Sequence, residues 1–431
     1  MTTLKAVRGT RDLLPPETAL WNRIEATARQ VFARYNFGEI RTPVFEDTAL
    51  FARGVGEETD IVSKEMYTWE DRARAQSEKT QSLTLRPEST AGVVRAYIEH
   101  GLGESGQLQK LYYIGPQFRR ERPQKGRYRQ FSQIGAEVIG PPSAGSESPI
   151  RDAEVLEMLA TLLDELGITG WTLHLNSVGS AADRARYNEA LKAALVPVVE
   201  QMCVDCQRRA VTNPLRVLDC KVPADQPIIE TLPVIADSLD EASRAHFAQV
   251  LTALDAAGVP YSRNHRLVRG LDYYTRTTFE FAHGGLGAQN ALLGGGRYDG
   301  LSEMLGGPRA PGIGFAMGED RLVLTLQALE TAQLQEKAAA FVAPLGESLN
   351  PAALALAREL RQSGIRIELG EGSFRLKKSF EAADKSARAI VILGEDELQS
   401  GILTVKTFAT GIQTKVPRAE LAAFLGNEPQ I

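Results

Sequence analysis

Apolar residues recur every three or four positions in several parts of the chain, which is the spacing of an amphipathic helix. Within residues 17–35 they are Leu20, Ile24, Ala28 and Val31. The same spacing marks residues 150–166, and residues 91–100 follow a proline turn with three potential capping residues. We predict helices over these three segments and a mostly helical region over residues 183–247.

Two strand patterns lie close together near the middle of the sequence. Residues 111–118 and 127–139 are rich in aromatic and β-branched residues, and Pro123 and Gly126 stand between them. Proline cannot donate to a strand ladder and glycine permits a turn, so the two segments form a predicted hairpin. Between Leu111 and Phe131 the loop region of this hairpin is cationic, with one acid, Glu121, and six basic residues: Arg119, Arg120, Arg122, Lys125, Arg127 and Arg129.

The second arm of this hairpin carries polar groups on one face. Strand side chains alternate between faces, so Phe131, Gln133, Gly135 and Glu137 point the same way as Arg129. The glycine leaves a gap between a carboxamide and a carboxylate. A small polar ligand would fit into that gap.

Further strands are predicted at residues 37–45, 171–177, 267–275 and 312–318. Pro43 makes the first an edge or terminal strand. Alternating glycines give the last one a bare face, on which a flat ring could lie, and a helix begins after it at Glu319. From residue 341 onward, strand and helix patterns alternate, which favours a separate α/β domain.

Composition places the chain among ordinary globular proteins. Its 431 residues predict two or three domains, and 43% are hydrophobic and 24% charged. With 49 basic and 54 acidic residues the formal charge is −5, so any contact with nucleic acid depends on local patches. The sequence shows neither a signal-peptide core nor a run of about 18 apolar residues, so we expect a cytoplasmic protein without a membrane span.

The three cysteines, Cys203, Cys206 and Cys220, fall in one region. The first two have the C-x-x-C spacing of a zinc site, but such a site normally needs four ligands. His174 and His246 have no motif spacing to them. Three free thiols are the favoured interpretation, zinc remains the alternative, and no side chain is assigned to a metal.

Several strings resemble those of one family. The hairpin strings FRRE and RYRQFSQ are similar to motif 2 of the class II aminoacyl-tRNA synthetases, in the form found in histidyl-tRNA synthetases. The strings LRPEST (85–90), LVRGLDYYT (267–275) and GGRYDGL (295–301) resemble peptides of the same family, and residues 312–321 resemble motif 3. The helix and strand over residues 17–45 resemble motif 1.

The resemblance implies roles for particular residues. The implied catalytic residues are Arg119, Arg269 and Arg321. The implied ATP-binding residues are Arg119, Arg127 and Arg321. Histidine is bound by Glu88, Thr90, Gln133, Glu137, Arg269, Tyr273, Tyr274 and Tyr298, with Arg297 a further pocket candidate. Arg122 and Gln124 are candidates for contact with the tRNA acceptor end.

The fold that the resemblance implies is α+β. Residues 1–170 and 263–332 would form a catalytic domain with a mostly antiparallel sheet flanked by helices. Residues 171–262 would form a helical insertion, and residues 333–431 an anticodon-binding α/β domain. The implied activity is the ATP-dependent ligation of histidine to its tRNA, with Mg²⁺, in a homodimer.

Other interpretations remain open at this point. Glu88 and Thr90 suit helix capping, and residues 267–275 suit a purely structural polar network. Arg122 and Gln124 suit an exposed loop. The regulatory paralogue of ATP phosphoribosyltransferase binds histidine without charging tRNA, but it typically lacks the C-terminal domain. A synthetase for another amino acid is a further alternative, against which the tyrosine string argues.

Overall fold

The computed structural model describes residues 3–56, 59–71, 80–123, 126–268, 271–286, 290–329 and 337–426. The chain divides into two compact units, Met1–Ala332 and Gln333–Ile431. Within the described ranges, every helix is too short or too polar to cross a lipid bilayer.

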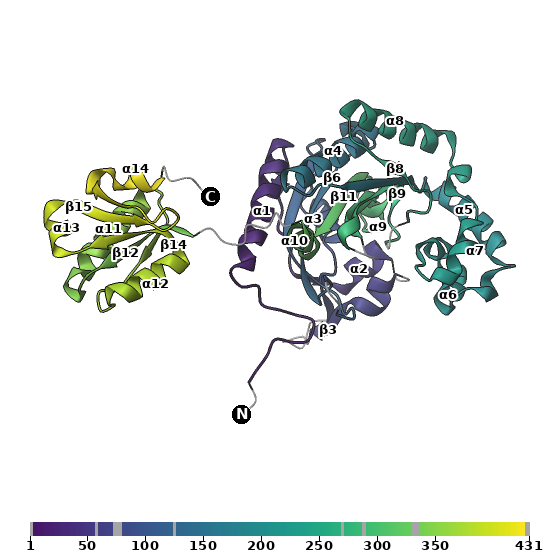
Figure 1. Ribbon diagram of the computed structural model, residues 1–431. Helices are drawn as coiled ribbons and strands as arrows, with labels where there is room; N and C mark the ends of the chain where they lie inside the picture. Colours follow the sequence, from purple (N-terminus) through teal and green to yellow (C-terminus); the bar gives the residue numbers. More distant parts are fainter. Residues whose placement is uncertain are drawn as a thin grey trace. The chain divides into compact units, whose positions relative to one another are not determined.

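An eight-stranded sheet forms the centre of the first unit (Figure 1). Its strands are antiparallel to their neighbours except in the two edge pairs, β1 with β5 and β7 with β8. In order across the sheet they are β1 (Gly38–Glu39), β5 (Gln109–Phe118), β6 (Gln130–Ile139), β11 (Gly312–Gly318), β10 (Ala291–Arg297), β9 (Thr275–His283), β7 (Trp171–Ser177) and β8 (Ser262–Arg263). The predicted hairpin and the α+β fold with a mostly antiparallel sheet are confirmed.

Helices cover one face of this sheet and bury its apolar side chains. They are α1 (Glu17–Arg34), α4 (Pro149–Glu165), α8 (Glu241–Ala257) and α10 (Glu319–Ala328). Ile134, Ala136 and Val138 of β6 belong to this core. The alternate residues of β6 therefore face the other side of the sheet, toward α3 (Thr90–Glu99) and α9 (Leu301–Met304). The helices predicted over residues 17–35, 91–100 and 150–166 are confirmed to within one residue at either end.

A three-stranded sheet lies in the same unit beside α2 (Thr48–Val55). Its strands, in order, are β2 (Phe45–Asp47), β4 (Gln81–Leu85) and β3 (Tyr67–Asp71). The single strand predicted over residues 37–45 is therefore wrong, because β1 and β2 belong to different sheets. Pro43 lies in the segment that crosses between them, where its missing N–H breaks no ladder.

The insertion lies between β7 and β8, and both of these strands belong to the eight-stranded sheet. Its helices are α5 (Ala181–Leu195), α6 (Val204–Thr212) and α7 (Gln226–Glu230), joined by short 3₁₀ turns. They enclose a small core of their own, which includes Tyr187, Leu191 and Val217. Figure 1 shows these helices at one side of the unit.

The second unit contains a five-stranded sheet with its own core. In order across the sheet, the strands are β13 (Ile367–Leu369), β12 (Ala338–Pro344), β14 (Ala387–Leu393), β15 (Ile402–Thr407) and β16 (Gln413–Pro417). The helices are α11 (Asn350–Gln362), α12 (Leu376–Ser386), α13 (Glu395–Ser400) and α14 (Leu421–Gly426). The predicted alternation is confirmed, although the sequence pattern did not reveal α13 and β16.

Candidate active site

Two neighbouring compartments lie on the face of β6 that points away from the main core. The arginine pocket is an open cavity lined by Arg119, Arg127, Phe131, Gln133 and Arg321, among others. The Glu137 chamber is a closed cluster of polar and aromatic side chains. Its members are Glu88, Thr90, Tyr113, Glu137, Tyr273, Tyr274 and Tyr298.

Each cation of the arginine pocket is held by its own local contacts. The guanidinium of Arg119 lies over the Phe131 ring at 5.2 Å from its centre, and its Nε donates to the Pro87 carbonyl at 2.9 Å. Arg321, in the first turn of α10, donates to the Ala291 carbonyl at 2.8 Å. Arg119 follows the hairpin strand β5, and Arg321 lies at the start of α10. Two arginines from distant parts of the sequence therefore line one cavity.

The pocket carries an excess of positive charge. Glu121 accepts from Arg127 at 3.0 Å and lies 3.9 Å from Arg119, so one carboxylate serves two guanidinium groups. Burial, and then the nearby charge of Arg127, lower the pKa of Arg321. An anionic ligand would relieve that repulsion, and guanidinium groups suit phosphate oxygens because they present fixed forks of donors.

For three of the site residues that the resemblance implies, the structure shows no contact within the two compartments. Arg269 and Gln124 lie outside the described residues, so the predicted convergence of three arginines is seen only for Arg119 and Arg321. Arg122 is exposed in the hairpin connection.

Glu137 stands at the centre of the closed chamber and is fully buried. One carboxylate oxygen accepts from the hydroxyl of Thr90 and the other from the hydroxyl of Tyr298, each at 2.7 Å. Among the ion pairs found within the described residues, none includes Glu137. The side chains that donate hydrogen bonds to it are neutral hydroxyl groups.

That environment favours the protonated form of the acid. Burial raises the pKa of Glu137 to about 8, although the hydroxyl donors of Tyr298 and Thr90 act in the opposite direction. Burial raises the pKa of Glu88 as well. A ligand with an N–H donor or a positive charge would stabilise the carboxylate form.

Three tyrosines named from the sequence meet in this chamber. The rings of Tyr273 and Tyr274 lie 4.8 Å apart between centres, and those of Tyr273 and Tyr298 lie 5.9 Å apart. The strand predicted over residues 267–275 is wrong, because residues 271–274 form a turn and β9 begins at Thr275. The turn lets consecutive tyrosines reach one chamber, whereas a strand would send them to opposite faces.

Glu88 holds the start of α3. Its two oxygens accept from the backbone N–H groups of Thr90 and Ala91 at 2.8 and 2.9 Å. The capping interpretation of Glu88 is therefore confirmed. Thr90 instead directs its hydroxyl to Glu137.

Tyr113 is a member of the chamber that the sequence did not suggest. It pairs with Gly135 across the hairpin, and a Cβ atom on Gly135 would lie 2.3 Å from the Tyr113 hydroxyl. The predicted gap between Gln133 and Glu137 is therefore filled by this ring. The register of the hairpin, which sets a tyrosine opposite a glycine, was the signal that could have revealed it.

The bare face of β11 is also occupied. A Cβ atom on Gly314 would lie 1.6 Å from a carboxylate oxygen of Glu137, and one on Gly312 would lie 2.5 Å from the Tyr298 ring. These two glycines make room for protein side chains. Only the end of the strand, at Ala316 and Gly318, lines the open pocket where a flat ligand ring could lie.

Arg297, a pocket candidate from the sequence, lies elsewhere. It is fully buried and pairs with Asp152 at 2.6 Å and Asp299 at 2.9 Å, while it also donates to the Ser146 carbonyl at 2.6 Å. The assignment to the pocket is wrong because neighbouring residues of a strand face opposite sides of the sheet. Tyr298, the next residue, reaches the chamber instead.

Comparisons with known proteins cover nearly the whole chain. The family model described as "Histidyl-tRNA synthetase" matches residues 9–322, and the one described as "Anticodon binding domain" matches residues 339–428. A histidine–tRNA ligase of Koribacter versatilis (strain Ellin345) is 72% identical over 425 residues, which cover 98% of this chain and 96% of the relative.

More distant matches agree. A histidine–tRNA ligase of Solibacter usitatus (strain Ellin6076) is 56% identical over 424 residues, covering 98% of this chain and 99% of the relative. The apo histidyl-tRNA synthetase of S. aureus matches with a TM-score of 0.79 at 38% identity, over 98% of this chain and 100% of that one.

These matches decide between the interpretations that the sequence left open. The regulatory paralogue typically lacks a C-terminal domain, whereas here the anticodon-binding match continues to residue 428. The relatives named above are ligases specific for histidine. The chain therefore belongs to the histidyl-tRNA synthetase family, the ATP-dependent ligases that activate histidine as its adenylate and transfer it to the matching tRNA.

Proposed function

We propose that the Glu137 chamber binds the histidine substrate and that the arginine pocket binds ATP. The observation that carries this proposal is the arrangement along β6, where Gln133 lines the arginine pocket and Glu137 lies in the chamber. Gln133 and Glu137 are four residues apart on this strand, a separation of about 13 Å. A histidine with its imidazole at Glu137 would therefore direct its carboxylate toward the arginines.

This arrangement suits adenylate formation. The histidine carboxylate attacks the α-phosphorus of ATP in line, and pyrophosphate leaves. Two anions must approach each other, and Arg119 and Arg321 offset that repulsion while they hold the nucleotide. No general base is required, because a carboxylate is already ionised at neutral pH. Arg269 is proposed as the third cation, on the basis of its sequence motif.

Mg²⁺ fits this site as an ion carried by the nucleotide. The two carboxylates that line the arginine pocket, Glu121 and Asp320, are both paired with arginines. Mg²⁺ commonly binds substrate phosphates and keeps several waters, and it would supply further charge neutralisation at the phosphates.

Recognition of the imidazole falls to the chamber. A neutral imidazole has one N–H donor and one acceptor nitrogen, which a carboxylate and a tyrosine hydroxyl can satisfy. Glu137 and the hydroxyls of Tyr273 and Tyr274 supply those groups, and Glu88 and Thr90 with Gln133 would hold the α-amino group. Because Tyr113 lies over Gly135, histidine entry requires this ring to move aside.

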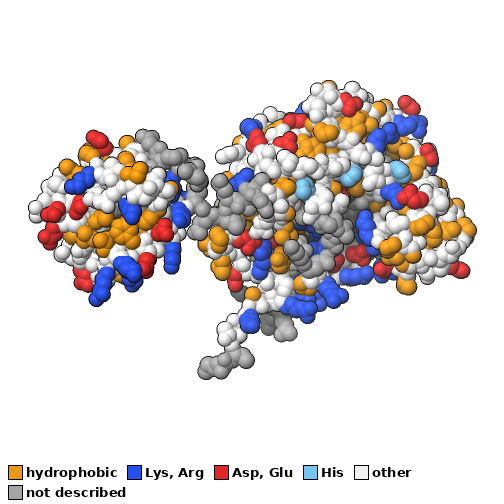
Figure 2. Space-filling model, viewed as in Figure 1, with side chains coloured by type: hydrophobic (Ala, Val, Ile, Leu, Met, Phe, Trp, Pro, Cys, Tyr) orange, Lys and Arg blue, Asp and Glu red, His pale blue; other side chains and the backbone are white. Residues whose placement is uncertain are grey.

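Transfer to tRNA follows in the second step. The ribose hydroxyl of the terminal adenosine attacks the adenylate carbonyl, a phosphate oxygen of the adenylate takes the proton, and the bond between the carbonyl carbon and the phosphate oxygen breaks to release AMP. Arg122 and Gln124 are proposed contacts to the acceptor end, and residues 333–431 to the anticodon. Figure 2 shows basic side chains gathered along the lower edge of the first unit in that view, which gives local positive surface despite the formal charge of −5.

A homodimer in the cytoplasm is proposed as the working form. Beyond the resemblance to motif 1, the three-stranded sheet and the residue before β2 expose apolar side chains: Val44, Phe45 and Trp69 are 39%, 53% and 40% exposed. Exposed aromatic groups that lie close together are typical of interfaces. Light scattering tests this, since Phe45→Asp would convert a dimer into a monomer, and a monomeric wild type would refute the proposal.

Substitutions in each compartment distinguish histidine binding from ATP binding. Glu137→Gln keeps the size of the side chain but cannot form the carboxylate that a bound imidazole N–H would stabilise, so the KM for histidine should rise about 100-fold. Arg321→Ala should raise the KM for ATP instead, and exposed Glu303→Gln on α9 is the control. Histidine-dependent exchange of pyrophosphate into ATP measures both constants. Equal effects of Glu137→Gln on the two constants would remove Glu137 from the histidine pocket.

A further inference from the structure

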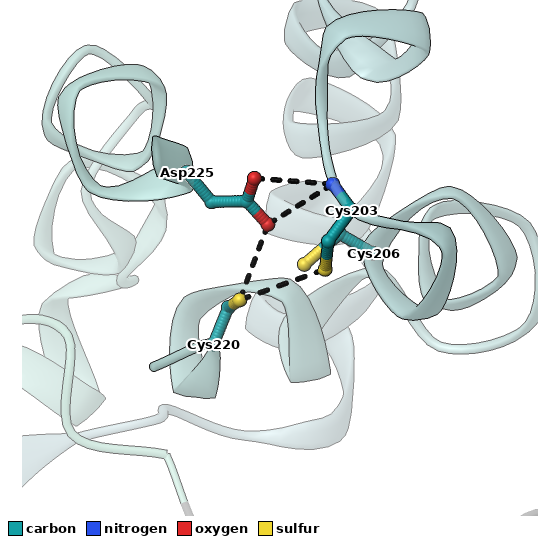
Figure 3. Close-up of side chains that lie close together, drawn as sticks. All are labelled: Cys203, Cys206, Cys220 and Asp225. Atoms are coloured by element: carbon teal, nitrogen blue, oxygen red, sulfur yellow. Dashed lines mark hydrogen bonds between the residues drawn. The ribbon is translucent and has the colours of Figure 1, made fainter. Parts of the chain in front are cut away.

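Three cysteines and one acid converge inside the insertion, far along the chain from the residues of the two compartments. The sulfur atoms of Cys203, Cys206 and Cys220 and a carboxylate oxygen of Asp225 all lie within 4.8 Å of one another. Figure 3 shows the four groups turned toward a common point. Cys206, Cys220 and Asp225 are buried, and Cys203 is partly buried.

Two of the distances between these atoms are close to those in a tetrahedral metal site. Two thiolates bound to zinc at about 2.3 Å lie about 3.8 Å apart, and a thiolate and a carboxylate oxygen lie about 3.5 Å apart. The sulfur atoms of Cys203 and Cys220 are 3.9 Å apart, and the Cys220 sulfur is 3.2 Å from an Asp225 oxygen. A disulfide requires about 2.05 Å, and it would leave Cys206 without a partner.

Backbone N–H groups of the local structure are directed at these atoms. Cys203 immediately precedes the first turn of α6, and Cys206 lies within that turn. The backbone N–H of Cys203 donates to both Asp225 oxygens at 3.1 and 3.2 Å, and the N–H of Val222 donates to the Cys220 sulfur at 3.4 Å. Such backbone donors orient ligands around a metal.

The surrounding segment has little regular secondary structure and only a small core. Between Val199 and Ser238 the secondary structure consists of α6, the five-residue α7 and short 3₁₀ turns. The four residues connect α6, the end of the 3₁₀ turn Pro214–Asp219 and the turn Pro223–Asp225. Small units of this kind are often stabilised by a structural metal.

We propose that Cys203, Cys206, Cys220 and Asp225 bind a structural zinc ion. Four protein ligands close the coordination sphere, so the site stabilises the fold and performs no chemistry on a substrate. The metal also fixes the segment between Cys206 and Cys220. Within that segment, Asn213 donates to Asp272 at 3.0 Å and Arg216 to Asp60 at 3.3 Å, which ties the insertion to the rest of its unit.

Metal content of the purified full-length protein tests the proposal. We expect about one zinc ion per chain after dialysis under reducing conditions, measured by elemental mass spectrometry. Cys206→Ser and Asp225→Asn should lose the ion. Asp205→Asn is the matched control, because Asp205 lies between the two cysteines of the C-x-x-C string but is exposed. Full zinc content in Asp225→Asn would contradict the assigned fourth ligand.

A second measurement uses the unaltered chain, since replacing a buried cysteine can itself disturb folding. Cobalt added to the metal-free protein should give sulfur-to-metal charge-transfer absorption and the strong visible bands of a tetrahedral site, saturating at about one equivalent. Zinc should abolish that spectrum. The proposal is overturned if cobalt gives neither band, or if peptide mapping finds Cys203 and Cys220 joined as a disulfide in a metal-free, active protein.

Discussion

Single side chains decide how the Glu137 chamber is shaped. Gly314 lies directly opposite Glu137 in the sheet, and no side chain can be added there without displacing the carboxylate. Gly314→Ala should therefore raise the KM for histidine at least tenfold, because the carboxylate loses its place between Thr90 and Tyr298. Pyrophosphate exchange at varied histidine concentration measures the effect.

The control for this substitution lies on the same strand. A Cβ atom on Gly318 would meet its nearest neighbour, the Arg321 side chain, at 3.9 Å, which is an ordinary contact. Gly318→Ala should leave the KM for histidine close to the wild-type value. If both variants bind histidine as well as the wild type, the chamber is not where the substrate lies.

The pKa of Glu137 predicts a pH dependence of stability. The pKa is about 8 in the folded chain and near 4.5 when unfolded, so the folded state binds an extra proton between these values. The resulting stabilisation is complete below the unfolded value and is lost as pH rises through about 8. Glu137→Gln removes this loss, so its urea midpoint should rise relative to the wild type between pH 6 and pH 9. Parallel pH profiles for the two proteins would contradict the buried, protonated acid.

Sequence patterns identified individual residues of the chamber unevenly. Strand alternation singled out Glu137, and the family resemblance named the tyrosines at 273, 274 and 298; the structure brings all four together. Tyr113 did not stand out, since a tyrosine is ordinary in a strand and its significance depends on Gly135 opposite. Asp225 was missed because an acid five residues after a cysteine does not match the usual spacing of zinc ligands in a sequence.

At the scale of elements, Arg297 ties the end of β10 to α4 through Asp152. Both partners are fully buried, so removing one leaves an uncompensated charge in the core. Arg297→Met should lower the free energy of unfolding by about 3 to 5 kcal/mol. Arg309→Met breaks the exposed pair with Glu147 and should cost less than about 1 kcal/mol. Urea denaturation measures both, and equal losses would show that the buried pair does not hold these elements.

Element boundaries followed from the sequence where a pattern was long and regular. The hairpin and α1 have strong periodicity, and both are present. Short segments were harder, because β1 and β2 are two and three residues long and their separation depends on tertiary pairing. The turn at 271–274 was misjudged for a related reason, since aromatic residues favour strands until packing brings consecutive tyrosines to one chamber.

The whole molecule consists of units with separate cores, and both compartments lie within the first. A chain ending at Ala332 should therefore fold and retain histidine-dependent pyrophosphate exchange. Its kcat/KM for tRNA charging should fall about 100-fold or more, which corresponds to a few kcal/mol of lost tRNA contact. Circular dichroism checks the fold of the truncated chain. Loss of exchange in a folded truncated chain would mean that the second unit contributes to adenylate formation.

In the proposed mode of binding, the imidazole lies at Glu137 while the attached nucleotide lies among the arginines. A crystal structure of the protein with a non-hydrolysable histidyl-adenylate analogue tests it most directly. We expect that the imidazole contacts Glu137, that Tyr113 has left its position over Gly135, and that Arg119 and Arg321 contact the nucleotide. An analogue bound with its imidazole away from Glu137, and with Tyr113 still over Gly135, would contradict it.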